Sequence, residues 1–354
     1  MQRRTFIKKA SVSSLALAAM PHLLFSKQGD KMSNQTWDKV FPKNDEIAIK
    51  KVEFKNRFGI TLVGDLYTPK NTKQGKFAAI AISGPFGAVK EQASGFYAQT
   101  LAEQGFITLA FDPSFTGESA LANKNLPQNV ASPDINTEDF SAAVDFLSNQ
   151  SNVDAEKIGI LGICGFGGFA INAAAMDTRI KATVASTMYD MTRVNAYGYN
   201  DTMDAKARYA LKEQLNKQRT LDFKNKSYAK AQGLPEKLTG DEPQFIKDYW
   251  DYYKTKRGFH KRSINSNGNW NQTSSLSLMN LPILAFSDEI QNAVLVIHGE
   301  KAHSRYFSED AFKKLKGKNK ELLIIKDASH VDLYDNADKI PFAKITEFFK
   351  ANLV

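Results

Sequence analysis

A glycine-rich stretch, Gly162-Ile163-Cys164-Gly165-Phe166-Gly167-Gly168, separates a run that predicts a buried strand, residues 157–161, from a segment that predicts a helix, residues 169–176. A sharp strand-to-helix turn lifts its central side chain above the edge of a sheet and needs small residues around it. Cys164 is the central residue, and Phe166 stands where a second glycine is usual. The sequence therefore predicts a variant nucleophile elbow that presents the Cys164 thiol.

Cys164 is the only cysteine in the chain. An intramolecular disulfide and a metal site built from several thiolates are therefore excluded. A lone cysteine is commonly a buried thiol that packs as a small apolar group. At the start of a helix and beside a histidine, however, a thiol has a lowered pKa and acts as a nucleophile. We expect Cys164 to belong to this second kind.

The first residues, Gln2 to Lys8, contain paired arginines, a hydrophobic pair and a lysine, in the pattern of a twin-arginine export signal. An apolar run over residues 10–25 follows, and it is shorter than the roughly 20 apolar residues that span a bilayer. The sequence therefore predicts a twin-arginine signal peptide over residues 1–26 and a polar leader over residues 27–46. We expect export by the twin-arginine machinery to the periplasm and no stable membrane anchor.

The positive charge of the chain does not indicate a nucleic-acid partner. The formal charge of +9 falls to +5 without the four cations of the signal, and the other lysines are scattered. Nothing in this distribution resembles a nucleic-acid-binding stripe. The absence of disulfides suits a protein that finishes folding in the reducing cytoplasm before export.

Strand-like and helix-like segments alternate along most of the chain. Residues 47–55 and 60–68 alternate between apolar and polar residues around a turn and predict a hairpin. Buried-strand patterns and helical patterns then follow one another over residues 77–186 and again over residues 293–354. This order predicts an α/β fold with a mostly parallel, doubly wound sheet and an antiparallel N-terminal hairpin.

The alternation stops between Asp190 and Ala285, where 16 basic, 10 acidic and 12 aromatic residues gather. Helices are predicted near residues 203–216 and 243–256, and a loop over residues 263–277. We interpret residues 190–285 as a helical lid inserted into a domain that spans residues 47–354. Four aromatic residues of this segment are expected to pack the lid onto the body of the domain rather than to contact a substrate. They are Tyr249, Trp250, Tyr252 and Tyr253.

A cysteine nucleophile needs a base, and a doubly wound sheet presents its functional loops at the carboxyl ends of its strands. His330 follows the last predicted strand and is therefore the expected base. In the chain order nucleophile, acid, histidine, the acid lies on the loop after the strand over residues 293–297. Position 302, where an aspartate is usual, is alanine. Glu300 is the predicted acid, and Asp332 is the alternative.

An oxyanion hole in this arrangement takes one backbone amide from the residue after the nucleophile and another from the loop after the third strand. Gly165 is the expected first donor. The turn-forming loop Gly84-Pro85-Phe86-Gly87 makes Phe86 the expected second donor. Lys90 and Glu91 follow this loop, and we expect them to brace it or to face solvent rather than to act in catalysis.

Several stretches resemble motifs of one superfamily. They are Val52–Asn56, Gly64–Tyr67, Gly84–Gln92, Gly162–Cys164 with Gly167 and Gly168, His298–Glu300 with Ala302–Ser304, and His330–Asp335. With them the chain resembles the dienelactone hydrolase-like branch of the α/β hydrolase superfamily. It is more closely similar to uncharacterised bacterial hydrolases of that branch that are related to fungal polyketide transferases. The resemblance covers the chain from about residue 47 to its end and implies the α/β-hydrolase fold.

The resemblance also implies a chemistry. It implies a triad of Cys164, His330 and an acid, a covalent thioester intermediate that water resolves, and neither a metal nor an organic cofactor. We expect a hydrolase that cleaves a small-molecule carboxylic ester or lactone. One alternative is an acyltransferase, in which an alcohol or amine takes the thioester. Another is a periplasmic binding protein on a hydrolase fold that has lost its chemistry.

Overall fold

A computed structural model of the chain describes residues 37–71 and 74–354. The predicted export signal over residues 1–26 lies outside these residues, so export to the periplasm stays a prediction. Residues Asp38–Val354 form one compact unit. None of the helices in the described ranges is both long and apolar enough to cross a membrane.

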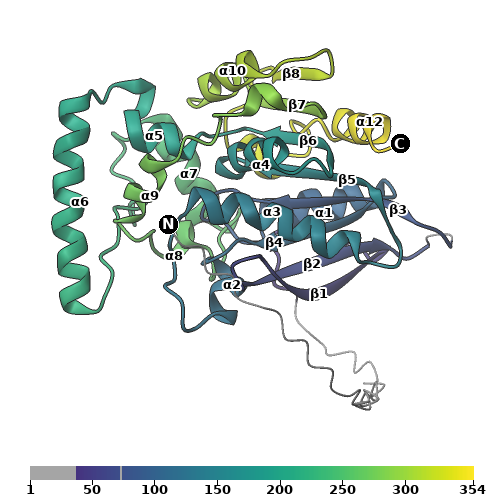
Figure 1. Ribbon diagram of the computed structural model, residues 1–354, viewed down its shortest axis with the longest axis horizontal. Coiled ribbons are helices and arrows are strands. Elements are labelled where there is room, and N and C mark those ends of the chain that lie inside the picture. The colour runs from purple at the N-terminus through teal and green to yellow at the C-terminus, as the bar shows by residue number, and fades with distance from the viewer. Residues whose placement is uncertain (1–36, 72–73) are drawn as a thin grey trace, which may run out of the picture. The chain divides into compact units, whose positions relative to one another are not determined.

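The central sheet contains eight strands in the described part of the chain. They are β1 (Ile47–Lys55), β2 (Thr61–Pro69), β3 (Phe77–Ser83), β4 (Ile107–Asp112), β5 (Val153–Ile163), β6 (Ile180–Ser186), β7 (Ala293–Gly299) and β8 (Lys320–Ile325). Their order across the sheet is β1-β2-β4-β3-β5-β6-β7-β8 (Figure 1). β2 pairs antiparallel with β1 and β4, and all other neighbours are parallel. The predicted sheet with its antiparallel N-terminal hairpin is therefore confirmed.

Helices cover both faces of the sheet because successive side chains of its central strands point to opposite sides. The helices of the body are α1 (Ala93–Glu103), α2 (Gly117–Ala122), α3 (Pro133–Ser148), α4 (Gly165–Met176), α10 (Arg305–Lys314), α11 (Asp332–Asp335) and α12 (Phe342–Asn352). On β5, Ile160 belongs to the same core as Phe169 of α4. The next residue, Leu161, belongs to the opposite core with Phe349 of α12.

Residues 190–285, here called the inserted segment, lie between the adjacent parallel strands β6 and β7. Their helices are α5 (Met191–Tyr197), a short 3-10 turn (Tyr199–Asp201), α6 (Ala205–Asn225), α7 (Gln244–Lys254), α8 (Ile264–Asn267) and α9 (Ser274–Asn280). The tract predicted as a loop over residues 263–277 therefore contains α8 and the start of α9. In Figure 1, α6 runs beside the body with most of its length away from the sheet, and only Leu215 and Asp222 of this helix are buried.

Phe166 explains how the elbow tolerates a bulky residue where a glycine is usual. Its ring is fully buried and packs against Phe140 of α3 and Phe169 of α4, with ring centroids 6.1 Å and 5.2 Å away. The crowded position is Gly162 instead, because a Cβ there would lie 2.0 Å from the carbonyl oxygen of Phe166. The elbow therefore needs glycine on its strand side and uses Phe166 as a core residue on its helix side.

Replacing Phe166 by alanine should lower the free energy of unfolding by about 3–5 kcal/mol, because it leaves a cavity between α3 and α4. Phe223 on α6 is 89% exposed, so Phe223→Ala is the matched control and should change stability by no more than about 0.5 kcal/mol. Urea unfolding followed by circular dichroism measures both. A loss below about 1 kcal/mol in F166A would contradict a packing role for this ring.

Candidate active site

Cys164 occupies the turn between β5 and α4 with a strained backbone. Its φ of 56° and ψ of −126° are rare for a residue other than glycine. Three backbone hydrogen bonds hold this conformation. The Cys164 N–H donates to the Ser186 carbonyl (3.0 Å), and the Cys164 carbonyl accepts from the N–H groups of Gly167 and Tyr189 (both 2.9 Å). The side chain consequently stands over the carboxyl ends of the parallel strands.

The thiol of Cys164 lies in a buried environment of hydrogen-bond donors, and the residue is 7% exposed. Burial raises the pKa of the thiol. Hydrogen bonds from the Tyr334 hydroxyl and from the backbone amides of Gly165 and Phe86 favour the thiolate and offset this increase only in part. The expectation of a lowered thiol pKa is therefore wrong, because burial outweighs the donors.

The loop after β3 brings the Phe86 amide to the sulfur. Gly84 allows the close approach, because its φ is +99° and a Cβ there would lie 2.3 Å from the Ile163 carbonyl oxygen. The inserted segment holds the loop from the other side. The Asn265 side-chain amide donates to the Phe86 carbonyl (2.8 Å), and the Phe86 ring stacks on Trp270 with centroids 4.0 Å apart. Phe86 and Gly165, the two predicted donors, thus both contact Cys164.

Lys90 follows this loop and stabilises it through a buried ionic cluster. Its ammonium group pairs with Glu91 and Glu118 (both 2.5 Å) and with Asp112 (3.5 Å). Arg262 of the inserted segment adds an ion pair to Glu91 (2.7 Å). Burial raises the pKa of Asp112 to about 6 although the Lys90 charge opposes this. Lys90 is fully buried, so of the two roles expected for it the bracing role fits and the solvated one does not.

His330 follows β8 and reaches Cys164 through a tyrosine. Its Nε2 lies 3.1 Å from the hydroxyl of Tyr334, and the same hydroxyl hydrogen-bonds to the Cys164 thiol. On the other side of the ring, Nδ1 lies 2.5 Å from Ser304 Oγ and 3.1 Å from Thr187 Oγ1. The structure therefore brings the predicted base to the predicted nucleophile with one hydroxyl linking them.

The histidines of the site are uncharged at neutral pH. Burial, together with the nearby rings of His303 and His298, holds the pKa of His330 well below its usual value. Burial likewise lowers the pKa of His298 to about 3 and that of His303 to about 4. His330 is thus a neutral imidazole, which has a free lone pair to accept a proton.

Glu300, the predicted acid, does not orient His330. Its backbone N–H donates to the Ile325 carbonyl (2.9 Å), which extends the pairing of β7 with β8 by one residue. The side chain is exposed, and its carboxylate accepts a hydrogen bond from the Asp327 N–H (3.0 Å). The extended pairing therefore turns Glu300 towards solvent, and its prediction as the partner of His330 is corrected.

Asp332, the alternative acid, has a local structural role. Its carboxylate accepts from the backbone N–H of Ser329 (2.7 Å), and its own N–H donates to the Ser329 hydroxyl (3.2 Å). These reciprocal bonds fix the turn that carries His330. Among the described residues, the hydrogen-bond partners of the His330 ring carry hydroxyl groups and no carboxylate.

Three hydroxyl residues of this site were not predicted. Tyr334 lies four residues after His330, and a histidine and a tyrosine at this spacing face the same side of a helical turn. This spacing was the one local feature that could have revealed it. Ser304 directly precedes α10 and Thr187 follows β6, so their approach to His330 depends on how separate parts of the chain pack.

A cavity of about 260 Å³ opens at Cys164. Its lining is mostly aromatic and apolar: Phe86, Cys164, Tyr189, Met191, Val194, Leu234, Phe245, Tyr249, Tyr253, Asn265, His303 and Tyr334. Tyr249 and Tyr253, expected to pack the inserted segment onto the body, thus also face the cavity, whereas Tyr252 packs beneath against Tyr334 with centroids 5.1 Å apart. Among the described residues, no group of three or more His, Cys, Asp or Glu side chains could hold a metal ion.

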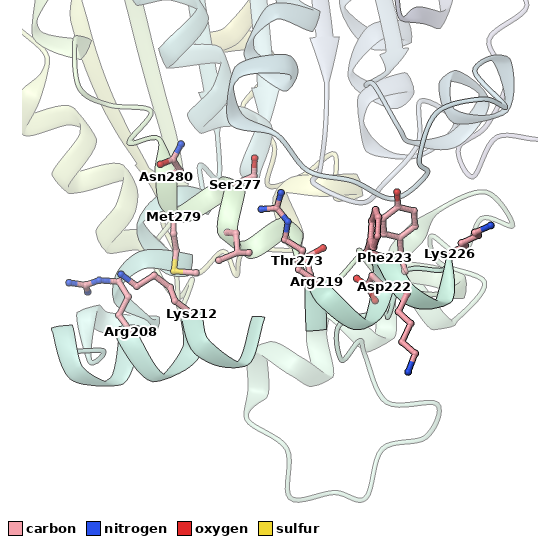
Figure 2. A pocket seen from close by; sticks show the side chains of 13 residues that line it. Arg208, Lys212, Arg219, Asp222, Phe223, Lys226, Thr273, Ser277, Met279 and Asn280 are labelled. Carbon is pink, nitrogen blue, oxygen red and sulfur yellow. The ribbon is translucent and has the colours of Figure 1, made fainter. Parts of the chain in front are cut away.

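A larger hollow of about 1260 Å³ lies elsewhere, between α6 and α9 of the inserted segment. Figure 2 shows Arg208, Lys212 and Arg219 of α6 around it, with Met279 and Asn280 of α9 opposite. Its lining residues do not include the cysteine or any histidine. Cys164 and His303 line the smaller cavity instead.

The sheet order, the cysteine at the strand-to-helix elbow and the histidine after the last strand define an α/β hydrolase. Residues 45–200 match the PET hydrolase-like family. The chain is 56% identical over 320 residues to the uncharacterised protein PA2218 of Pseudomonas aeruginosa, covering 90% of this chain and 85% of that protein. The crystal structure of PA2218 superposes with a TM-score of 0.85, covering 90% of this chain and 98% of that one at 55% identity. The chain therefore belongs to the same family as PA2218, and it has the α/β-hydrolase fold.

More distant proteins share parts of the sequence or the fold. A thiohydrolase of Aspergillus aculeatus, aneE, is 32% identical over 142 residues, which cover 40% of this chain and 42% of that protein. The α/β hydrolase GrgF from a Penicillium species superposes with a TM-score of 0.68 at 19% identity, covering 86% of this chain and 99% of that one. At 19% identity, the similarity to GrgF is a similarity of fold.

Alkylation of Cys164 by iodoacetamide should follow a pKa above the value of about 8.5 for a free cysteine, because burial disfavours the thiolate. The rate should therefore rise with pH into the alkaline range. Tyr334→Phe should raise this pKa further, since the thiolate loses a donor, whereas Tyr252→Phe should leave it unchanged. Mass spectrometry reports the reaction at one site because the chain has one cysteine. A pKa below that of free cysteine would contradict the buried, neutral thiol.

Proposed function

We propose that the protein hydrolyses small carboxylic esters or lactones through a thioester on Cys164. The observation that carries this proposal is the convergence of two backbone amides, those of Gly165 and Phe86, on the sulfur at the elbow. Two converging amides form an oxyanion hole for acyl transfer. A thiol that merely filled space in the core would need no such donors.

The reaction begins when the Cys164 sulfur attacks the carbonyl carbon of the substrate. The S–C bond forms, the carbonyl oxygen becomes an oxyanion, and the amides of Gly165 and Phe86 bind it in place of the sulfur. Collapse of this intermediate breaks the bond to the alkoxy oxygen and leaves a thioester on Cys164. Each amide of such a hole contributes about 3 kcal/mol of transition-state stabilisation.

Proton transfer follows the hydrogen bonds from Cys164 to His330. The thiol proton passes to the Tyr334 oxygen while the Tyr334 hydroxyl proton passes to His330 Nε2, which lies 3.1 Å away. His330 then returns a proton through the Tyr334 hydroxyl to the departing alcohol. Because the thiol pKa is raised and the His330 pKa is lowered, both groups are neutral at rest, and the proton moves only as the sulfur attacks.

Water completes the cycle. A water molecule attacks the thioester carbon and gives a proton through the Tyr334 hydroxyl to His330, and the same amides bind the second oxyanion. The S–C bond breaks, the carboxylic acid leaves, and the thiol of Cys164 regains its proton. In a lactone the alcohol and the acid are parts of one molecule, so the product is a hydroxy acid.

The cavity indicates a compact substrate with an apolar or aromatic acyl group. Its volume of about 260 Å³ lies just below the usual range of about 300–1,000 Å³ for ligand pockets. The rings of Tyr249, Tyr253 and Phe245 form much of its wall. The comparisons support the hydrolase class, since residues 45–200 match the PET hydrolase-like family and part of the chain matches a protein named as a thiohydrolase.

Replacing Cys164 by alanine should reduce hydrolysis of p-nitrophenyl acetate by on the order of 10⁴-fold or more, because no nucleophile remains. Wild-type protein quenched with acid during turnover should carry one acetyl group on Cys164 in its mass spectrum, and the variant should carry none. An unchanged melting temperature shows that the variant is folded. Undiminished hydrolysis by C164A would refute the proposal.

Tyr334→Phe should lower kcat by about 10²-fold while KM changes little, because the variant breaks the proton path but keeps the ring. Tyr252→Phe is the matched control. Tyr252 is also fully buried and its ring contacts Tyr334, but it lies outside the path from Cys164 to His330. Steady-state kinetics with the same ester measure both variants. Equal kcat in Y334F and the wild type would remove Tyr334 from the mechanism.

A further inference from the structure

A line of buried hydrogen bonds continues from His330 away from the cavity. His330 Nδ1 lies 2.5 Å from Ser304 Oγ, and the same oxygen lies 3.0 Å from Nε2 of His298. Nδ1 of His298 lies 2.6 Å from Ser308 Oγ. His298, Ser304 and Ser308 are fully buried, and His330 is 2% exposed. The line joins the end of β7, the first turns of α10 and the loop after β8.

The hydrogens of this line have one arrangement that suits a base at His330. A neutral imidazole has one donor and one acceptor nitrogen. For His330 Nε2 to accept a proton from Tyr334, Nδ1 must carry the hydrogen and donate it to Ser304. The Ser304 hydroxyl then donates to Nε2 of His298, which must itself carry its hydrogen on Nδ1 and donate to Ser308. Every polar atom of the line has a partner in this arrangement.

Thr187 is compatible with this arrangement. Its hydroxyl donates to the His330 backbone carbonyl (3.3 Å), so its oxygen can accept from His330 Nδ1 at 3.1 Å. The hydrogen on Nδ1 is therefore shared between two hydroxyl oxygens. Both oxygens favour the same tautomer of His330.

We propose that Ser304 and His298 are positioning residues that replace the acid of the triad: they fix His330 with its hydrogen on Nδ1 and stabilise the imidazolium that forms during attack. This inference rests on the function proposed above. Ser304 acts on His330 directly, and His298 acts through Ser304 by accepting the serine hydrogen. A catalytic carboxylate in other enzymes of this kind supplies the same tautomer and orientation.

The surroundings of His330 explain why two uncharged residues, Ser304 and His298, can take the place of a carboxylate. The titratable groups whose rings face it are His298, His303, Tyr189, Tyr249 and Tyr334. Arg305 on α10 adds a positive charge that acts on His298. A buried carboxylate without full hydrogen bonding would be costly in such a place, and the usual position of the acid, residue 302, is a buried alanine.

The charge that forms on His330 can be shared along the line. When Nε2 receives a proton, Nδ1–H becomes a stronger donor to Ser304, and the serine becomes a stronger donor to His298. Among the described residues, only Ser304 bonds Nε2 of His298. The lone pair of this nitrogen can therefore accept the strengthened hydrogen bond from the serine. A serine without a histidine behind it would lack this acceptor.

Kinetics with p-nitrophenyl acetate test the proposal. Ser304→Ala should lower kcat by about 10²-fold with little change in KM, because His330 loses the nearer of its two acceptors and its link to His298, and keeps only Thr187. Ser304→Thr should restore most of kcat, since it keeps the hydroxyl. Ser287→Ala is the matched control, because Ser287 is a buried serine that bonds only a backbone carbonyl (Leu284, 3.0 Å) among the described residues. Unchanged kcat in S304A, or no recovery in S304T, would overturn the proposal.

A spectroscopic readout separates this proposal from the proposed function. Long-range ¹H–¹⁵N correlation spectra of protein labelled at histidine report which ring nitrogen carries the hydrogen and need no substrate. We expect the hydrogen on Nδ1 of both His330 and His298, and a change at His330 in S304A and in His298→Phe. A hydrogen on Nε2 of His330 in the wild type would overturn the proposal even if esters are cleaved. Absent turnover with the expected tautomers would refute the hydrolase function alone.

Discussion

The backbone conformation of Cys164 is the constraint on which the rest of the site depends. Three backbone hydrogen bonds, to the end of β6, to α4 and to the loop that follows β6, hold this residue at positive φ. A strained residue of this kind costs about 1–3 kcal/mol and persists only when its surroundings over-determine it. The position of the sulfur is then fixed, and the segments after β3, β5 and β8 bring Phe86, Gly165 and Tyr334 into contact with it.

The inserted segment shapes the cavity and also holds the loop that carries the Phe86 amide. Asn265 bonds the Phe86 carbonyl, and Ser263 donates to the Gly87 carbonyl (2.9 Å), so the segment holds the loop that carries the second amide. The same segment places Tyr249 and Tyr253 in the cavity wall. The wall of the cavity and the position of the Phe86 amide are therefore linked through the same segment, so a shift of one would shift the other.

Local patterns in the sequence predict the sheet, its hairpin and the elbow. Strand alternation and the glycines around Cys164 reflect local backbone geometry, which does not depend on how distant residues pack. They also suffice to place Gly165 and Phe86, which are fixed by their distance along the chain from β5 and β3. The partner of His330 could not be predicted in this way. One extra backbone pairing between β7 and β8 turns Glu300 outward, and the approach of Ser304 depends on how α10 packs. The thiol pKa likewise depends on burial that distant residues provide.

The neutral state of the thiol also bears on its redox chemistry. Oxidation of a cysteine by peroxide starts from the thiolate and can proceed to sulfinic and sulfonic acids, which are hard to reverse. Burial raises the pKa of Cys164, so little thiolate is exposed to an oxidant. The chain has no second cysteine that could trap an oxidised sulfur as a disulfide. The burial that keeps the Cys164 thiol neutral thus also protects its sulfur from irreversible oxidation.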